Sequence, residues 1–325
     1  MRAFRYVLGR LVKAFLIVLA VAILNFLLIR VAPGDPATVI AGQSGDADAT
    51  YLAQLRSDFG LDEPLPVQLG IYLQKLAVLD FGMSYRERRP VADIIWERLP
   101  STLEITATAF LLALAAGVLL GTLAAVNRGG VWDRVSTAVS LIFYATPLFW
   151  VGLLLVLVFS VELNWLPAFG RTTIGGPESG FPALLDRLRH LVLPVLTLTL
   201  FYLALYARMT RASMVETLDM DFIKTARAKG VGRRRILFVH ALRNAVLPIV
   251  TLAGVQVGQL LSGAIIIETI FGWPGLGLLA FNAVLQRDYN TLLAVFFVTS
   301  LLVVVANLIV DGLYLLIDPR TGARA

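Results

Sequence analysis

Six long apolar runs divide the chain, and each is long enough to cross a lipid bilayer as a helix. A transmembrane helix needs about 20 predominantly apolar residues. The runs fall at residues 11–31, 102–126, 135–161, 190–209, 245–270 and 291–317. The pattern predicts an all-α integral membrane protein with six transmembrane helices and a long loop after the first helix.

The first apolar run begins like both a secretion signal and a membrane anchor, because four basic residues lie between Arg2 and Lys13. A cleaved signal has an apolar core of about 7–15 residues and a small-residue cleavage site. This run extends over residues 11–31, and no such site follows it. We therefore interpret it as a retained first helix.

Lysine and arginine are concentrated in alternate connecting segments, with nine of them between Arg208 and Arg243. Cytoplasmic loops carry the excess of these residues, so both termini are predicted to be cytoplasmic. Within the long first loop, amphipathic stretches at 51–59 and 67–79 predict a partly helical cap. The predicted divisions are a cytoplasmic segment with the first helix (1–31), an extracytoplasmic region (32–101), a five-helix core (102–317) containing a cytoplasmic segment (213–243), and a cytoplasmic tail (318–325).

Composition agrees with a membrane protein and excludes several other classes. Apolar residues make up 58% and charged residues 15% of the chain, and the mean hydropathy is +0.79. The net charge of +6 belongs to residues flanking apolar runs, so it does not indicate a nucleic-acid partner. No cysteine is present, which excludes disulfides and thiolate metal sites, and no metal site is expected.

Polar side chains inside the fifth apolar run are candidates for a solute path, since polar groups at membrane depth persist mainly where they face protein or water. Gln256, Gln259 and Ser262 lie within one to two helical turns, and Glu268 stands near the predicted outer end. Amides and hydroxyls at this spacing also join helices to one another, and that alternative stays open. A carboxylate so close to hydrocarbon needs a partner, a solute or water.

The segment between the fourth and fifth runs predicts a short, well-capped helix. Asp219 and Asp221 offer an N-cap and favourable charge in the first turn, Arg227 and Lys229 suit the last turn, and Gly230 supplies a stop. This segment is much longer than a turn, so a docking role is expected.

One face of this helix would carry a large and two small residues, because Phe222, Ala226 and Gly230 recur every four positions. Another backbone could approach such a face closely. The arginine cluster at 233–235 favours an alternative, an interfacial helix held at anionic headgroups.

Several short motifs, in this order along the six runs, resemble those of the inner-membrane permease subunits of ABC importers for dipeptides, oligopeptides and similar solutes, including glutathione and nickel complexes. The resemblance runs nearly end to end. The motifs are Pro-Gly-Asp-Pro at 33–36, Phe-Gly-Leu-Asp at 59–62, Asp-Phe-Gly-Met-Ser at 80–84, Arg-Leu-Pro-Ser-Thr-Leu at 98–103, Thr-Ala-Arg-Ala-Lys-Gly at 225–230, His-Ala-Leu-Arg-Asn at 240–244, Glu-Thr-Ile-Phe-Gly-Trp-Pro-Gly-Leu-Gly at 268–277, Arg-Asp-Tyr at 287–289 and Asp-Pro-Arg at 318–320.

The resemblance implies the type I ABC importer permease fold and a coupling helix that sits in a groove of an ATPase subunit. It also implies two ATPase subunits or a fused pair, a second homologous permease, and an extracytoplasmic peptide-binding protein. Two departures from the wider importer pattern are visible: Lys224 stands where a glutamate is usual, and the following proline comes only at Pro248. The residues expected to couple to the ATPase are Phe222, Thr225, Ala226, Ala228, Lys229 and Gly230.

No Gly-x-x-x-x-Gly-Lys-Ser/Thr phosphate loop occurs in the chain, so ATP and Mg²⁺ are expected on the partner subunits. Catalytic residues are not expected here, because the chain lacks His-Glu-x-x-His and Gly-x-Ser-x-Gly arrangements. The main alternative is an ion-coupled secondary transporter, in which Glu268 or Asp311 would carry the coupling ion. The expected location is the inner membrane of a bacterium or archaeon.

Overall fold

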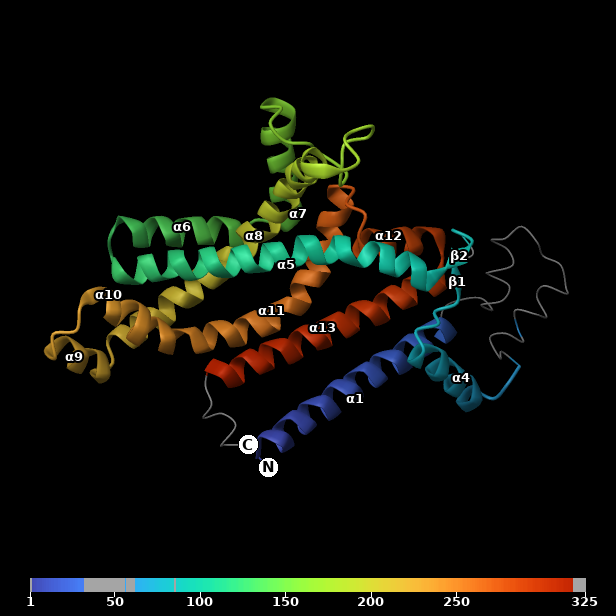
Figure 1. Ribbon diagram of the computed structural model, residues 1–325, viewed down its shortest axis with the longest axis horizontal. Coiled ribbons are helices and arrows are strands. Elements are labelled where there is room, and N and C mark those ends of the chain that lie inside the picture. Colours follow the sequence, from blue (N-terminus) through green and yellow to red (C-terminus); the bar gives the residue numbers. More distant parts are fainter. Residues whose placement is uncertain (1, 32–55, 57–61, 85, 318–325) are drawn as a thin grey trace. The chain divides into compact units, whose positions relative to one another are not determined.

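The computed structural model describes residues 2–31, 56, 62–84 and 86–317 (Figure 1). The predicted amphipathic stretch at 51–59, the motifs at 33–36 and 318–320 and the tail 318–325 therefore fall outside the described residues, apart from residue 56. The chain forms two compact units, one of residues 3–100 with 275–305 and one of residues 101–274 with 306–325. The division of the chain into an extracytoplasmic region and a five-helix core stays a prediction.

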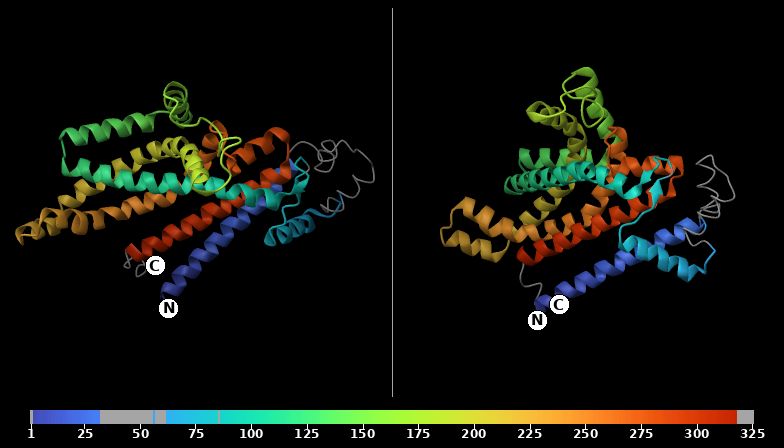
Figure 2. Two further views of the ribbon diagram at one scale, coloured as in Figure 1. Left: turned by 45° about the horizontal axis from the view of Figure 1, so that its top comes forward. Right: turned by 45° about the vertical axis from the view of Figure 1, so that its right-hand side comes forward.

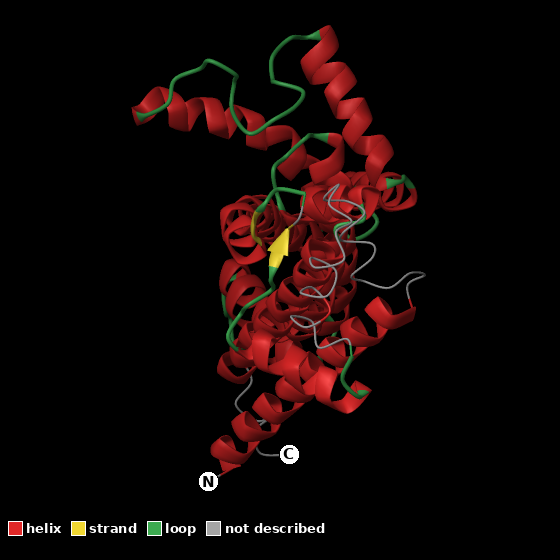
Figure 3. Ribbon diagram, turned by 90° about the vertical axis from the view of Figure 1, so that its right-hand side faces the viewer, coloured by secondary structure: helices red, strands yellow, loops and turns green. Residues whose placement is uncertain are grey.

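The first unit is built on long apolar helices and one small hairpin. Helices α1 (Arg2–Val31), α4 (Leu65–Ala77) and α12 (Leu276–Gln286) lie in it, with the beginnings of α5 (Val91–Val126) and α13 (Tyr289–Ile317). Strands β1 (Met83–Ser84) and β2 (Arg89–Pro90) pair antiparallel, and they are the only strands in the described part of the chain (Figure 3). Helix α4 confirms the helical stretch predicted at 67–79.

Side-chain contacts tie the elements of the first unit together. Phe26 of α1 packs against Tyr72 of α4 with ring centroids 5.8 Å apart. The hydroxyl of Ser84 donates to Oδ2 of Asp288 at 2.5 Å, and the hydroxyl of Thr291 donates to the same oxygen at 2.8 Å. The backbone N–H of Thr291 donates to Oδ1 of Asp288 as well, so a buried carboxylate that accepts three hydrogen bonds fixes the hairpin to the start of α13.

The second unit is a bundle of helices around α8. Its helices are most of α5, then α6 (Val131–Ala145), α7 (Leu148–Leu155), η1 (Val156–Glu162), α8 (Gly180–Leu218), α9 (Asp221–Ala228), α10 (Arg233–Arg235), η2 (Ile236–Ala241), α11 (Leu242–Ile270) and the end of α13. In Figures 1 and 2, α5 and α6 run side by side in opposite directions, and η2 leads directly into α11. The main apolar core gathers residues from α5, α8 and α11, among them Ile105, Leu198 and Ile249, together with Tyr206.

Two glycines of α5 allow its backbone to lie against α8. A Cβ on Gly117 would stand 2.5 Å from the Cβ of Tyr206, and one on Gly121 would collide with the carbonyl oxygen of Ala207. Small residues four positions apart are typical of closely packed membrane helices. The Gly-x-x-x-Gly pattern was visible in the sequence but was not part of the prediction.

Helix boundaries differ from the predicted runs in ways that local chemistry explains. Helix α5 begins at Val91 rather than near residue 102, with Pro100 inside it. The third predicted run is not one straight helix: α6 and the α7–η1 segment meet at an angle of 104°. The break falls before Pro147, where Thr146 adopts extended backbone angles, as expected for a residue that precedes proline.

Five helices are long and apolar enough to cross a membrane, and the bent α6–α7–η1 segment makes six if it counts as one span. The chain is therefore an all-α membrane protein of the predicted class. Helix α8 has 39 residues, so it is about 58 Å long at 1.5 Å per residue. That is roughly twice the 30 Å thickness of a hydrocarbon core, so α8 must project well beyond it.

Candidate functional sites

The short helix α9 is held at the tip of two long helices of the second unit, here called the α9 end. Helix α8 continues to Leu218, nine residues past the predicted run, and the chain returns through α10 and η2 before α11. The segment from Arg233 to Ile270 is helical throughout. The two long helices thus extend the bundle and present α9 beyond their apolar parts.

Backbone hydrogen bonds close the C-terminus of α9. The N–H of Gly230 donates to the carbonyl of Arg227 at 3.0 Å, and the N–H of Val231 donates to the carbonyl of Ala226 at 3.1 Å. Gly230 has φ +75°, which completes a Schellman motif. The predicted glycine stop is confirmed. A Cβ on Gly230 would meet nothing within 4 Å in this chain, so the backbone angle and not crowding accounts for the glycine.

The N-terminus of α9 differs from the prediction. Met220 is the N-cap residue, and no side chain caps the helix there. Asp221 lies in the first turn as predicted, where its charge suits the helix dipole, and it pairs with Lys224 at 2.8 Å. Asp219 instead ends α8 and lies 3.5 Å from Arg128 in an exposed ion pair.

A small apolar cluster fixes α9 to the bundle. Ile223 is fully buried and Ala226 is 9% exposed. Their neighbours come from the ends of α5, α8, η2 and α11, so one face of α9 packs against the rest of this chain and is closed to a partner. The buried members are Ala125, Met214, Ile223, Ala226, Ile236, Ala241 and Ala245.

The predicted docking face of Phe222, Ala226 and Gly230 is therefore wrong in its composition. Ala226 points into the protein's own cluster, whereas Phe222 is 39% exposed. The other exposed positions of α9 include Thr225 and Ala228, and Lys229 and Gly230 after the helix are exposed too. The surface that a partner can reach is formed by these residues, and their role in coupling stays a prediction.

A partly buried ion pair joins α6 to α8 close to the α9 end. Asp133 is 4% exposed, and it accepts hydrogen bonds from Nε and Nη2 of Arg211, the second at 2.8 Å. It also accepts a bond from the N–H of Gly129 at 2.8 Å, which shapes the α5–α6 turn. The sequence prediction missed this pair. The sequence feature that could have revealed the pair is Asp133, a carboxylate at the start of an apolar helix that needs a partner.

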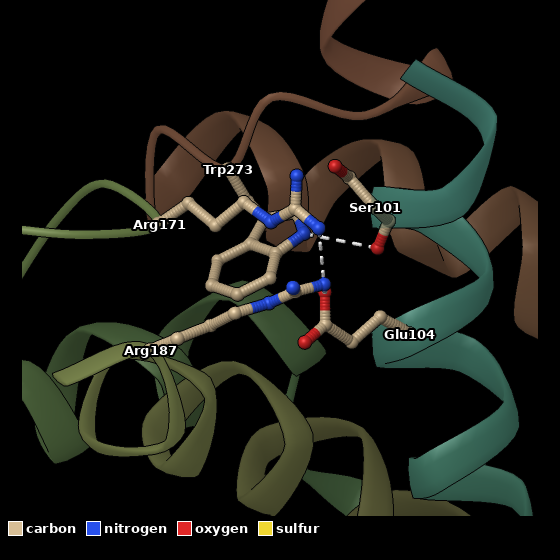
Figure 4. Close-up of polar contacts among 5 residues, drawn as sticks. All are labelled: Ser101, Glu104, Arg171, Arg187 and Trp273. Carbon is tan, nitrogen blue, oxygen red and sulfur yellow. Dashed lines mark hydrogen bonds and ion pairs between the residues drawn. The ribbon is translucent and has the colours of Figure 1, made fainter. Parts of the chain in front are cut away.

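The opposite end of the second unit, here called the Trp273 end, is held by a polar cluster (Figure 4). Oε2 of Glu104 on α5 accepts hydrogen bonds from Nη2 of Arg187 on α8 at 2.5 Å and from Nη2 of Arg171 at 3.1 Å. Arg171 belongs to the connection between η1 and α8, so one carboxylate unites three segments. Glu104 lies inside a predicted apolar run, which was the overlooked signal that it needs a partner.

Trp273 closes the same end. Its side chain is fully buried, and Nε1 donates to the carbonyl of Ser101 at 2.9 Å (Figure 4). The backbone N–H of Trp273 donates to the carbonyl oxygen of Glu268 at 2.9 Å. The backbone N–H of Gly170 donates to the carbonyl oxygen of Phe271 at 2.8 Å. The residues 268–273 that contributed to the family resemblance thus form a locked turn.

The structure does not bring the predicted solute-path residues onto one open face. Glu268 is fully buried and accepts a hydrogen bond from Thr102 at 2.7 Å, so the expected partner exists. Gln256 is 8% exposed, whereas Gln259 and Ser262 are exposed. The hydroxyl of Ser262 donates to the carbonyl of Gly258 at 3.2 Å. Only Gln259 and Ser262 can meet a solute in this arrangement.

Comparison with known protein families identifies the class of this membrane protein. The family described as binding-protein-dependent transport system inner membrane component matches residues 117–323. The N-terminal family of the same membrane components matches residues 3–106. The chain belongs to this family of transport-system permeases, which supports the predicted permease over an ion-coupled carrier.

Individual relatives match over nearly their whole length. The dipeptide transport system permease protein DppB of Escherichia coli strain K12 is 38% identical, over 97% of this chain and 98% of the relative. The di/tripeptide transport system permease protein DppB of Pseudomonas aeruginosa is 41% identical, over 96% of each chain. The glutathione transport system permease protein GsiC of Escherichia coli strain K12 is 41% identical, over 97% of each.

A solved structure supports the fold. The MetNI methionine ABC transporter, determined in inward-facing conformations, matches with a TM-score of 0.56 and 18% identity. The match covers 69% of this chain and 96% of that chain. The likeness supports the predicted type I ABC importer permease fold.

Proposed function

We propose that this chain is the permease subunit of an ATP-driven importer of dipeptides or oligopeptides. The full-length relatives that act on dipeptides, di/tripeptides and glutathione support the class of solute. The single observation that carries the mechanism is α9, a capped helix outside the apolar bundle whose free side is exposed. An autonomous carrier would not need such a segment.

The proposed assembly contains a second homologous permease, two ATPase subunits or a fused pair, and an extracytoplasmic peptide-binding protein, all at the lipid bilayer. ATP and Mg²⁺ bind to the ATPase subunits, this chain has no catalytic residue, and no nucleic acid takes part. Both termini and α9 lie on the cytoplasmic side of the inner membrane of a bacterium or archaeon. The region 32–101, including α4 and the hairpin, forms an extracytoplasmic cap.

Coupling runs through the exposed surface of α9, formed by Phe222, Thr225, Ala228 and Lys229. Ala226 anchors this surface from below and Gly230 shapes its end. When ATP closes the ATPase subunits, α9 moves with them and the long helices α8 and α11 carry the motion into the membrane. The spans then alternate between outward-facing and inward-facing states.

For the solute path we propose Gln259 and Ser262 as lining residues. Their neutral polar groups suit a peptide backbone, which is rich in hydrogen-bonding groups. Gln256 and Glu268 act from behind them as buried structural groups.

The test is a tryptophan at an exposed position of α9. Ala228→Trp adds bulk where a partner would dock, while the buried cluster under Ile223 and Ala226 is untouched. Reconstituted with the predicted ATPases, this variant is expected to lose the stimulation of ATP hydrolysis by peptide-loaded binding protein. Gly230→Trp is a poorer test, because φ +75° strains any side chain whether or not a partner docks.

The matched control is Ala212→Trp, the same substitution at an exposed position of α8. It is expected to leave stimulation unchanged. Normal coupling in Ala228→Trp would contradict the coupling role of α9. Solute accumulation by vesicles that contain this chain alone would contradict the proposed function altogether.

A further inference from the structure

Helix α6 is joined to α8 at two places, with unfilled space between them. At the start of α6, the carboxylate of Asp133 accepts hydrogen bonds from Nε and Nη2 of Arg211, the second at 2.8 Å. Near its end, the ring of Tyr144 stacks on that of Phe201, with centroids 6.1 Å apart. A cavity of about 260 Å³ lies between the two helices, and both Arg211 and Tyr144 line it. Side chains therefore do not fill the space between the two contacts, and the contacts themselves decide how α6 is held.

The two contacts differ in how strictly they fix α6. Both oxygens of Asp133 are used, because Oδ2 also accepts a hydrogen bond from the backbone N–H of Gly129 at 2.8 Å. One carboxylate thus joins the α5–α6 turn, α6 and α8, and hydrogen bonds demand a fixed geometry. The stacked rings of Tyr144 and Phe201 make an apolar contact, which is non-directional. The start of α6 is therefore fixed to α8, whereas its end can shift.

The ion pair stands next to the supports of α9. Met214 of α8 comes three residues after Arg211, and it is a buried member of the cluster that holds α9. Ala125 of α5 is another member, and Gly129 follows it by about one helical turn. A displacement of α9 that moves the ends of α5 and α8 therefore reaches Asp133 from both sides.

Helix α6 also provides a second connection to the Trp273 end. It leads through the 104° bend, α7 and η1 to Arg171. Arg171 and Arg187 of α8 donate to the same oxygen of Glu104 (Figure 4). Two routes along the chain, one through α6 and one through α8, thus run from the α9 end to one carboxylate. They can act together only if the start of α6 and the end of α8 move as one.

We propose that Asp133 and Arg211 are positioning residues of the transport cycle. Their ion pair makes α6 follow α8 when α9 moves, so that Arg171 and Arg187 leave Glu104 together. Without the pair, α8 still moves with α9, but α6 lags and the cavity absorbs the displacement. ATP is then hydrolysed without a matching import of peptide. This inference rests on the proposed coupling role of α9.

The test measures peptide imported per ATP hydrolysed by the complete transporter in proteoliposomes with binding protein. The decisive variant combines Asp133→Asn with Arg211→Gln, because either change alone leaves the other charge without its partner. The ratio is expected to fall at least about fivefold, the lower end of the usual coupling between two sites. ATP hydrolysis should continue, because the apolar cluster under α9 is unchanged.

Two further variants locate the effect. Arg211→Lys keeps the charge but loses the fork of N–H groups, so it is expected to lose part of the ratio. Arg128→Gln is the control, because it breaks a neighbouring ion pair with Asp219 whose side chains are 65% and 74% exposed. The control should behave like the wild type.

Three results would overturn the inference. The first is a wild-type ratio in the double variant. The second is an equal loss of ATP hydrolysis and import in that variant, since the ratio is then unchanged and the damage is general. If the double variant does not assemble, a wild-type ratio in Arg211→Lys is the third.

A distance measurement tests the motion itself. Because the chain has no cysteine, spin labels are attached through Ile142→Cys of α6 and Ala212→Cys of α8, two exposed positions, with cysteine-free partner subunits. With the ion pair intact, the distance between the labels should be the same with and without ATP. In the double variant it should change when ATP binds. A change of this distance already present with the pair intact would contradict the inference.

The same assays separate this inference from the proposed function. Absence of ATP-driven uptake by the wild type would refute the proposed function. Normal uptake by the wild type, together with a wild-type ratio in the double variant, would refute only the role of the Asp133–Arg211 pair.

Discussion

The α9 end and the Trp273 end belong to the same unit, yet different interactions hold them. At the α9 end, five buried apolar side chains of other elements pack around Ile223 and Ala226 of α9. The ion pairs of Asp219 and Asp221 there are exposed, and the nearby Asp133–Arg211 pair buries its carboxylate. At the Trp273 end, a carboxylate shared by two arginines and a buried indole N–H fix three segments. Apolar contacts are non-directional, whereas hydrogen bonds demand fixed geometry. The α9 end is therefore better suited to move. At the Trp273 end, the three joined segments are better suited to keep their positions relative to one another.

The largest effect is expected at Trp273, because it is a large side chain with no exposed surface. Trp273→Ala should destabilise the second unit by about 3–5 kcal/mol, the usual range for a buried aromatic residue. Thermal unfolding of the purified transporter in detergent measures this. Trp165→Ala, at a 60% exposed tryptophan, should change little. If the two substitutions lowered the thermal midpoint equally, the buried Trp273 would not be what fixes this end of the unit.

Glu104→Gln tests the polar part of the same end. The change leaves the guanidinium groups of Arg171 and Arg187 beside a neutral amide. The side chains of these arginines are only 27% and 39% exposed, respectively. We expect about 2–3 kcal/mol of destabilisation, below the range for fully buried pairs because solvent screens part of the repulsion. Glu97→Gln breaks an exposed pair with Arg89 and is the control in the same thermal assay. An unchanged thermal midpoint in Glu104→Gln would show that the polar cluster does not stabilise this end.

Gly230→Ala tests the α9 end through its backbone. A Cβ there has free space, so only the left-handed angle opposes it, at about 1 kcal/mol. The loss should appear as faster hydrogen exchange confined to α9, and Gly230→Asn should be milder because asparagine tolerates this angle. Gly232→Ala, with φ −60°, is the control. Exchange that accelerates throughout the bundle would contradict a separately anchored α9.

The smallest effect is expected from Lys224→Ala. Its ion pair with Asp221 has side chains 66% and 95% exposed, so water and salt screen it. The thermal midpoint should not change at low or high salt. A clear loss at low salt would mean that charges, and not the apolar cluster, hold α9.

The sequence predicted the class of fold and the existence of the short helix well, because apolar runs and a glycine stop act locally, but the N-cap residue is Met220 and not the predicted Asp219 or Asp221. It placed Gly230 correctly, since a left-handed stop is encoded by the glycine itself. It failed where partners come from distant segments: Ala226 is buried by α5, η2 and α11, and Glu104 meets arginines 67 and 83 positions away. The 104° bend lies between these two cases. Pro147 is visible in the sequence and marks a break in the helix, but the direction of the helix that follows depends on its packing against other segments.

Helix α8 carries Arg187 near one terminus and Met214 near the other, 27 residues further along. At 1.5 Å per residue these side chains are attached at most about 40 Å apart, on a rod that contains Pro194 between them. Pivoting that rod by about 5° around its midpoint would displace each attachment by roughly 2 Å in opposite senses. A modest tilt caused by a neighbour at α9 is thus enough to break the 2.5 Å contact with Glu104.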